Sequence, residues 1–86
     1  MGEGFNVFPN PSKKMVEVSF ILSQAANAEL SIYDMQGKIV KVVFTTQQLN
    51  PGEHHYPVDI SSLGTGAYLC KLEVDGIVKS KVLLKE

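Results

Sequence analysis

The sequence predicts an all-β fold, an immunoglobulin-like antiparallel β-sandwich of about seven strands. Apolar and polar residues alternate along short segments throughout the chain, and this period of two is typical of strands with one buried face. Clusters of glycine, proline, asparagine and aspartate separate the segments and indicate turns. No segment shows convincing helical periodicity. A small, partly open barrel is the alternative architecture.

Length and composition predict one domain and argue against several classes of protein. In this chain of 86 residues, we expect residues 1–3 to be a linker or a remnant of cloning and residues 4–86 to form a single domain. Eight lysines nearly balance nine acidic residues, which argues against a nucleic-acid partner. No apolar run approaches the roughly 18 residues of a membrane span, so the chain is not expected to cross a membrane. The single Cys70 cannot form an internal disulfide and is expected to be buried.

The first part of the chain predicts three strands. Residues 5–8 are expected to form a short edge strand that stops at Pro9 and Pro11, because proline has no backbone donor. Residues 15–22 form the second strand, and residues 28–33 form the third after a polar loop. The apolar face of the second strand consists of Val16, Val18, Phe20 and Leu22.

A hairpin is predicted to join the third strand to a fourth at residues 38–45. Residues 35–37 form a three-residue loop in this interpretation, with Gly37 in a left-handed conformation. The register then places the apolar residues of both strands on one side. The expected facing pairs are Asp34 with Lys38, Ile32 with Val40, and Leu30 with Val42.

The last three strands are predicted at residues 54–60, 67–74 and 77–85. Pro57 indicates that the first of these is an edge strand. The strand at 67–74 is expected to be central, because four alternating residues form its apolar face: Tyr68, Cys70, Leu72 and Val74.

Two turns are possible before the last strand. A two-residue Asp75-Gly76 turn pairs Val74 with Ile77 and directs two lysines, Lys79 and Lys81, to the core side, which is costly. A three-residue loop at 74–76 pairs Glu73 with Ile77 instead. We expect the three-residue loop, because it buries the apolar residues of the last strand: Val78, Val82 and Leu84.

No arrangement of residues predicts catalysis, a cofactor or a metal ion. The residue types of a hydrolytic triad occur between residues 54 and 62, but no nucleophile motif surrounds Ser61 or Ser62. Adjacent residues of a strand face opposite sides, so His54 and His55 cannot share a metal ion. The aspartates at strand ends are expected to accept hydrogen bonds in turns: Asp34, Asp59 and Asp75. The Tyr68 hydroxyl is expected to bond a backbone group at a corner of the sandwich.

Four short motifs occur in order along the chain, and together they resemble a known family. They are P-N-P at 9–11, D-x-x-G-K at 34–38, L-x-x-G at 49–52 and D-x-S-x-L-x-x-G-x-Y at 59–68. With a lysine-rich last strand, this series resembles the C-terminal sorting domain of proteins that the type IX secretion system of Bacteroidetes exports. The resemblance covers residues 5–86.

The resemblance implies a non-catalytic sorting signal at the end of a larger secreted or cell-surface precursor. The implied partners are the type IX translocon, an outer-membrane shuttle protein and a cell-surface sortase that removes the domain; a dimer through an edge strand is possible. The implied recognition residues are Pro9, Pro11, Gly66, Tyr68, Lys79, Lys81 and Lys85.

Two interpretations of the last strand and of the whole domain stay open. A receptor can pair with the last strand by strand addition, or its lysines can simply protect an edge from aggregation. A retained carbohydrate-binding or adhesive module is the alternative function. The absence of tryptophan, and tyrosines that fit core or turn positions, argue against it.

Overall fold

The computed structural model describes the backbone of residues 2–86 and the side chains from residue 4 onward. The expectation that residues 1–3 are a linker or remnant therefore falls partly outside the described residues, although Gly2 and Glu3 belong to the first strand. The described chain consists of seven strands joined by turns and contains no helix. They are β1 (Gly2–Phe8), β2 (Met15–Leu22), β3 (Ala26–Asp34), β4 (Ile39–Leu49), β5 (Gly52–Asp59), β6 (Gly66–Val74) and β7 (Ile77–Lys85).

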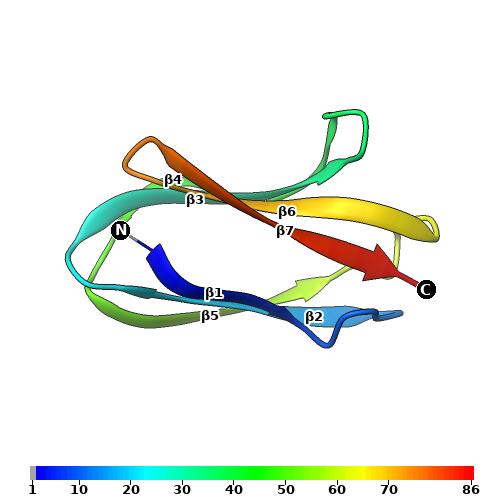
Figure 1. The fold of residues 1–86 in the computed structure, drawn as a ribbon, viewed down its shortest axis with the longest axis horizontal. Helices are drawn as coiled ribbons and strands as arrows, with labels where there is room; N and C mark the ends of the chain where they lie inside the picture. The colour runs from blue at the N-terminus through cyan, green and yellow to red at the C-terminus, as the bar shows by residue number, and fades with distance from the viewer. Residues whose placement is uncertain (1) are drawn as a thin grey trace.

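The strands form two antiparallel sheets packed face to face (Figure 1). One sheet has the order β1-β2-β5 and the other has the order β4-β3-β6-β7. This arrangement confirms the predicted immunoglobulin-like sandwich and excludes the partly open barrel. The predicted positions of β5 at an edge and of β6 in the middle of a sheet are also confirmed.

The core lies between the sheets and comes mainly from alternating residues of β2, β3, β5 and β6, with Phe5 from β1 and Leu83 from β7. The inward residues predicted for β2 are 0% to 2% exposed, and Cys70, Leu72 and Val74 of β6 are 0% to 3% exposed. This agreement follows from the period of two, since one face of each strand must avoid water. The largest fully buried side chains include Phe20, Leu22, Leu30, Ile32, Ile60, Leu72 and Leu83.

The β3–β4 hairpin has the predicted loop and a different register. Gly37 has a φ of 88°, and the Asp34 N–H donates to the Lys38 carbonyl at 2.8 Å, as expected. Three register shifts follow, so that Ile32 faces Lys41 and Leu30 faces Phe44. The predicted pairing with Val40 and Val42 is therefore wrong. Both valines are exposed, and each bulge adds one residue to β4 and changes which residues face the core.

The β6–β7 hairpin has a two-residue Asp75-Gly76 turn and not the expected three-residue loop. Val74 pairs with Ile77, and both turn residues have positive φ, 48° at Asp75 and 84° at Gly76. Such a turn matches the right-handed twist of the flanking strands. The expected pairing of Glu73 with Ile77 is therefore wrong, because Glu73 faces Val78.

This register reverses the predicted faces of β7. Val78, Val82 and Leu84 were expected in the core but are 43% to 53% exposed, whereas Leu83 is fully buried. Lys79 and Lys81 share the side of Leu83, yet they avoid the core because β7 is an edge strand. Lys81 is exposed and Lys79 is half-buried at the open side of the sandwich. The turn therefore does not bury a lysine ammonium in the core, and the expected energetic cost of that burial is absent.

Candidate functional site

The free edge of β7 is defined by the alternation of its backbone hydrogen bonds. In a two-residue hairpin the residues flanking the turn form a hydrogen-bonded pair, and such pairs recur at every second position. Val74 and Ile77 flank this turn, so the odd-numbered residues of β7 bond β6. The N–H and C=O groups of the even-numbered residues consequently point away from the sheet.

The segment Pro9–Ser12, here called the proline loop, covers the C-terminal half of this free edge. The Asn10 side-chain amide donates to the Val82 carbonyl at 2.7 Å, and its oxygen accepts the Leu84 N–H at 2.8 Å. The Ser12 N–H donates to the Leu84 carbonyl at 3.0 Å, and the Ser12 carbonyl accepts the Glu86 N–H at 2.9 Å. Ser12 also forms a parallel bridge with Lys85. Four hydrogen bonds thus attach the β1–β2 connection to the last strand.

The composition of the proline loop explains why Asn10 makes these contacts. Pro9 and Pro11 lack backbone donors, so they cannot form a regular ladder with β7. Asn10 lies between them and supplies both a donor and an acceptor from its side chain, as a backbone residue would. Ser12 is 8% exposed, and its hydroxyl donates to the Met15 carbonyl at 2.7 Å. The loop is therefore anchored to β2 as well as to β7.

The Gly66–Tyr68 segment supports the same end of β7 from the other side. Tyr68 faces Leu83, packs against the core and donates its hydroxyl to the Gly64 carbonyl at 2.6 Å. This bond confirms the predicted backbone partner at a sandwich corner. Gly66 faces Lys85 and has a φ of 152°, a conformation that side chains disfavour.

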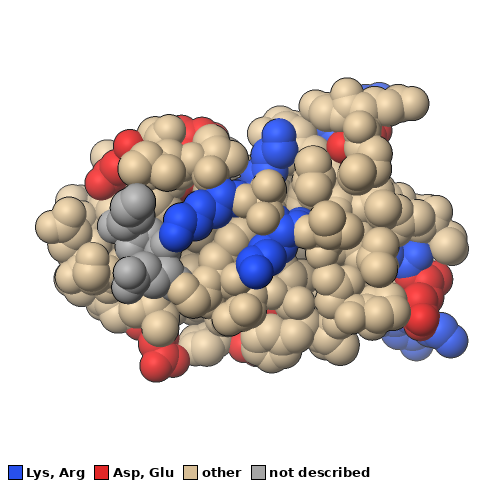
Figure 2. Space-filling view, viewed as in Figure 1, with Lys and Arg blue, Asp and Glu red and all other residues tan. Residues whose placement is uncertain are grey.

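The predicted recognition residues fall into two groups along β7. The residues at its C-terminal end lie around the proline loop, Gly66 and Tyr68, and include Lys85. Lys79 and Lys81 lie on the N-terminal half, beside an open groove that Gly4, Phe5, Asn6 and Ser80 also line. Figure 2 shows lysine side chains across the middle of the face on which β1 and β7 lie.

Asn10 and Ser12 are functional residues of this site that were not predicted from the sequence. The usable signal was an asparagine flanked by two prolines, because it is the only side chain there able to replace the missing backbone bonds. Its partners are 72 and 74 positions away, however, and a local pattern does not reveal them.

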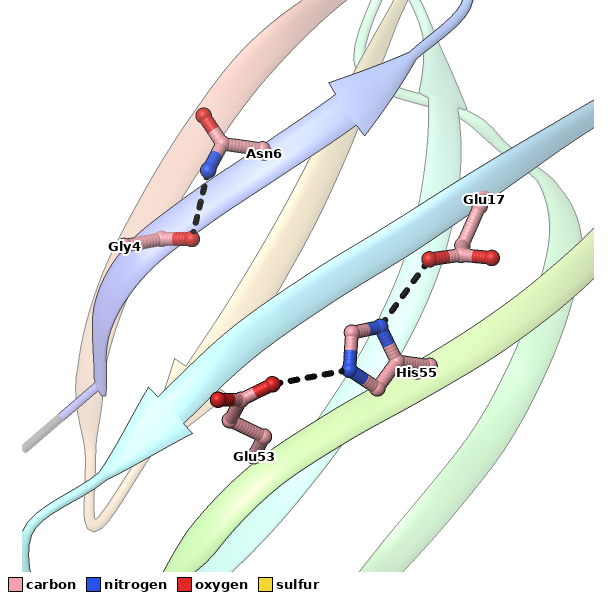
Figure 3. A network of polar contacts seen from close by, with 5 residues as sticks. All are labelled: Gly4, Asn6, Glu17, Glu53 and His55. Atoms are coloured by element: carbon pink, nitrogen blue, oxygen red, sulfur yellow. Dashed lines mark hydrogen bonds and ion pairs between the residues drawn. The ribbon is translucent and has the colours of Figure 1, made fainter.

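The two histidines confirm the prediction that they lie on opposite faces. His54 is half-buried, its ring stacks on Phe20 with centroids 5.3 Å apart, and its Nε2 lies 2.7 Å from the Asn50 carbonyl. His55 lies on the outer face between Glu17 at 2.9 Å and Glu53 at 3.2 Å (Figure 3). Hydrogen bonds to Glu17 and then to Glu53 raise the pKa of His55 above its usual value.

Asp34 and Asp59 accept backbone hydrogen bonds within their own turns, as predicted, whereas Asp75 accepts one from a distant segment of the chain. Asp34 accepts from the N–H groups of Gln36 and Lys38, and Asp75 accepts from that of Asn27. Asp59 accepts from both the N–H and the hydroxyl of Ser61, and these bonds lower the pKa of Asp59. The Ser61 hydroxyl therefore bonds a carboxylate and has no histidine partner. Among the described residues, no group of three possible ligands could hold a metal ion.

Two further side chains bear on the classes of function that were considered. Cys70 is fully buried, and desolvation raises the pKa of its thiol to about 12, so it is not a reactive nucleophile. Tyr33 lies on the outer face of the four-stranded sheet and not at a core or turn position as expected. The Lys71 ammonium lies over its ring, 4.4 Å from the ring centre, so a cation already occupies that face of Tyr33.

The comparison with known families decides the identity of the domain. Residues 6–86 match the family described as the secretion system C-terminal sorting domain. The chain belongs to this family. A search of curated proteins found no match. No helix in the described part of the chain is long and apolar enough to cross a membrane.

Membership confirms the function predicted from the motifs. The sorting domain is a signal for type IX secretion, and it marks the protein that carries it for export to the cell surface or beyond. Such domains interact with the type IX machinery and are generally non-catalytic. Neither the family match nor the surface around Tyr33 supports the carbohydrate-binding alternative.

Proposed function

We propose that the type IX machinery recognises the sorting domain at β7, which the proline loop and Tyr68 hold in place. The translocon and an outer-membrane shuttle protein are the partners in export, and a cell-surface sortase later removes residues 4–86 from the cargo. The observation that supports this proposal is the pair of hydrogen bonds from Asn10 to Val82 and Leu84. Because the Asn10 side chain bonds β7, the domain presents this strand to a partner in one fixed geometry.

The recognition residues have two different roles in this proposal. Four residues act as positioning residues: Pro9, Pro11, Gly66 and Tyr68. The two prolines shape the proline loop, and Gly66 and Tyr68 pair with β7 from β6. Lys79, Lys81 and Lys85 act as contacts, because they place positive charge along a strand at the edge of its sheet. Replacing a positioning residue is expected to lower stability and export together, whereas replacing the lysines is expected to lower export alone.

Strand addition to the whole of β7 is not available to a receptor. The proline loop already bonds the outward groups of Leu84 and Glu86 and the carbonyl of Val82. A partner that pairs with β7 must therefore use its N-terminal half or displace the loop. We propose that the loop stays in place, because its four hydrogen bonds and the buried Ser12 would be lost on release.

The domain itself is proposed to have no enzymatic activity. The catalytic residue types have structural partners, since Ser61 bonds Asp59 and His55 lies between two glutamates. The chemistry of removal belongs to the sortase, and the domain contributes only its recognisable surface.

The experiment that tests this proposal fuses residues 4–86 to a reporter in a type IX-competent strain. The variant carries Lys79→Gln, Lys81→Gln and Lys85→Gln, and the control carries Lys13→Gln, Lys14→Gln and Lys38→Gln. We expect the first variant to lose at least ten-fold in export while its unfolding midpoint is unchanged, and the control to be exported normally. Equal export of both variants would contradict a contact role for the lysines of β7.

The mass of the exported reporter tests the proposed removal step. Loss of residues 4–86 from the surface product is expected with the natural sequence. An exported reporter that keeps the domain would show a retained module and would contradict sortase removal.

A further inference from the structure

The N-terminal half of β7 is the one regular strand edge that the described structure leaves open. The β1 edge is interrupted by a register shift between Glu3 and Asn6, and the Gly4 carbonyl accepts the Asn6 side chain at 2.8 Å (Figure 3). β5 contains Pro57, and β4 has three register shifts against β3. Bulges and proline are the usual means of blocking an edge against pairing. The proline loop does the same for the second half of β7.

Five backbone groups remain without a partner at this open edge within the described chain. They are the N–H and C=O groups of Val78 and Ser80, which point away from β6, and the N–H of Val82. Their spacing is that of a regular antiparallel ladder. They offer the hydrogen bonds that an extended segment needs to join the sheet as a fifth strand.

A groove runs beside this edge, between β7 and β1. Its volume is about 530 Å³, and its lining includes Phe5, which is buried, with Lys79 and Lys81 on the β7 side. Gly4 contributes no side chain to the β1 side. The groove therefore has room for the side chains on one face of an added strand, and the two lysines lie next to them.

The two faces of β7 determine the composition of that strand. Side chains of an added strand that lie beside Lys79 and Lys81 are favoured when they are acidic. Side chains on the other face lie beside Val78 and Val82, which are 53% and 47% exposed and favour apolar, β-branched neighbours.

From these observations we infer that the open edge at Val78–Ser80, with its groove, binds an extended segment of a partner protein in which acidic and β-branched residues alternate. This inference rests on the proposal that the secretion machinery recognises β7, and it adds the chemistry of the partner segment. A second copy of the domain is the less suitable occupant. In a two-fold pairing centred on Ser80, Lys79 of one copy lies opposite Lys81 of the other, and like charges at facing positions are destabilising.

The test uses the isolated domain and a synthetic eight-residue peptide of alternating glutamate and valine. In NMR titrations of the ¹⁵N-labelled domain we expect amide shifts at Val78, Ser80 and Val82. Bound peptide should slow hydrogen exchange of the Ser80 amide at least ten-fold. A peptide of alternating lysine and valine is the matched control and is expected to cause neither effect. Shifts confined to other strands, or no shifts at 1 mM glutamate peptide, would overturn the inference.

Two variants separate the edge from the charge. Ser80→Pro removes an N–H that points away from β6, so it blocks strand addition without breaking the β6–β7 ladder. Lys81→Glu reverses the charge in the groove, with Lys14→Glu as the control at an exposed position that does not line the groove. We expect Ser80→Pro and Lys81→Glu each to weaken binding at least ten-fold, and Lys14→Glu to leave it unchanged. Unchanged binding in Ser80→Pro would contradict strand addition.

The outcomes also distinguish this inference from the proposed function. If sedimentation shows that the natural domain is a dimer and that Ser80→Pro is a monomer, a second copy of the domain occupies the edge. That result would overturn the inference that an acidic partner segment binds there. Normal export of the Ser80→Pro reporter, with peptide binding lost, would show that the edge binds such segments but is not the surface used in secretion. If the triple lysine variant is not exported but Lys85→Gln still binds the peptide, Lys85 is not needed for binding. That result would support the groove beside Lys79 and Lys81 as the site of recognition.

Discussion

The side-chain oxygen of Asn10 accepts a hydrogen bond from the backbone N–H of Leu84 at 2.8 Å, and so joins the first loop of the sandwich to its last strand. The same side chain donates to the Val82 carbonyl. One residue therefore replaces a stretch of neighbouring strand.

Replacing Asn10 by alanine tests this joint. The variant loses two hydrogen bonds at a partly solvated edge, so its free energy of unfolding is expected to fall by about 1 to 2 kcal/mol. Urea unfolding followed by circular dichroism measures the change, and hydrogen exchange of the Leu84 amide should become at least ten-fold faster. Asn50→Ala, in an exposed turn, is the control and should differ little from the natural domain. Equal stability of the two variants would show that the Asn10 bonds contribute nothing.

The Tyr68 hydroxyl is expected to contribute less than its ring. Tyr68→Phe removes only the bond to the Gly64 carbonyl and should cost about 1 kcal/mol. Tyr68→Ala also removes ring packing against the core and should cost about 3 to 5 kcal/mol. Tyr33→Phe is the matched control, since its ring lies on the outer face under Lys71. Calorimetric unfolding orders the three variants, and a Tyr68→Phe domain as unstable as Tyr68→Ala would contradict this division.

The turn at Asp75 should tolerate asparagine and resist alanine. Asp75 has a φ of 48° and accepts the Asn27 N–H at 2.9 Å. Asparagine adopts this conformation readily, whereas alanine pays about 1 to 2 kcal/mol for it and also loses the acceptor. Chemical unfolding of Asp75→Asn and Asp75→Ala provides the comparison. If the two are equally stable, the left-handed conformation at Asp75 is not a constraint on the hairpin.

The His55 cluster predicts a stability that declines as the pH rises. Glu17 and Glu53 favour the protonated ring, so the pKa of His55 in the folded domain lies above the usual 6.5. The stabilisation is complete below the unfolded-state pKa and is lost as the pH passes upward through the folded-state pKa. Urea midpoints of the natural domain and of His55→Gln should therefore differ most below pH 6.5 and converge as the pH rises above it. A difference that grows with pH would refute the assignment.

The inward faces of most strands were predictable, because alternation alone decides them where a strand is covered along its whole length. The register of β7 was not. Rejecting the Asp75-Gly76 turn assumed that everything facing Leu72 and Cys70 is core, but β7 lies at an edge, where Lys79 and Lys81 reach the open side. Strand order decides this point, and no local pattern encodes it.

Local patterns also limited which residues of the candidate site could be predicted from the sequence. Tyr68 and the prolines were identified because they belong to local motifs. Asn10 and Ser12 escaped notice because their partners come from the far end of the chain. In β4, three bulges moved Val40 and Val42 outward, and nothing in an alternating segment marks where an extra residue will be inserted.

The proline loop also sets the order of events during synthesis. Asn10 meets its partner 74 positions later, so the joint stays unmade until the ribosome has translated Leu84. A polypeptide that stops short of this point lacks the finished edge, whatever the state of the cargo before it. Truncation before Leu84 is therefore expected to weaken the attachment of the last strand to the rest of the sandwich.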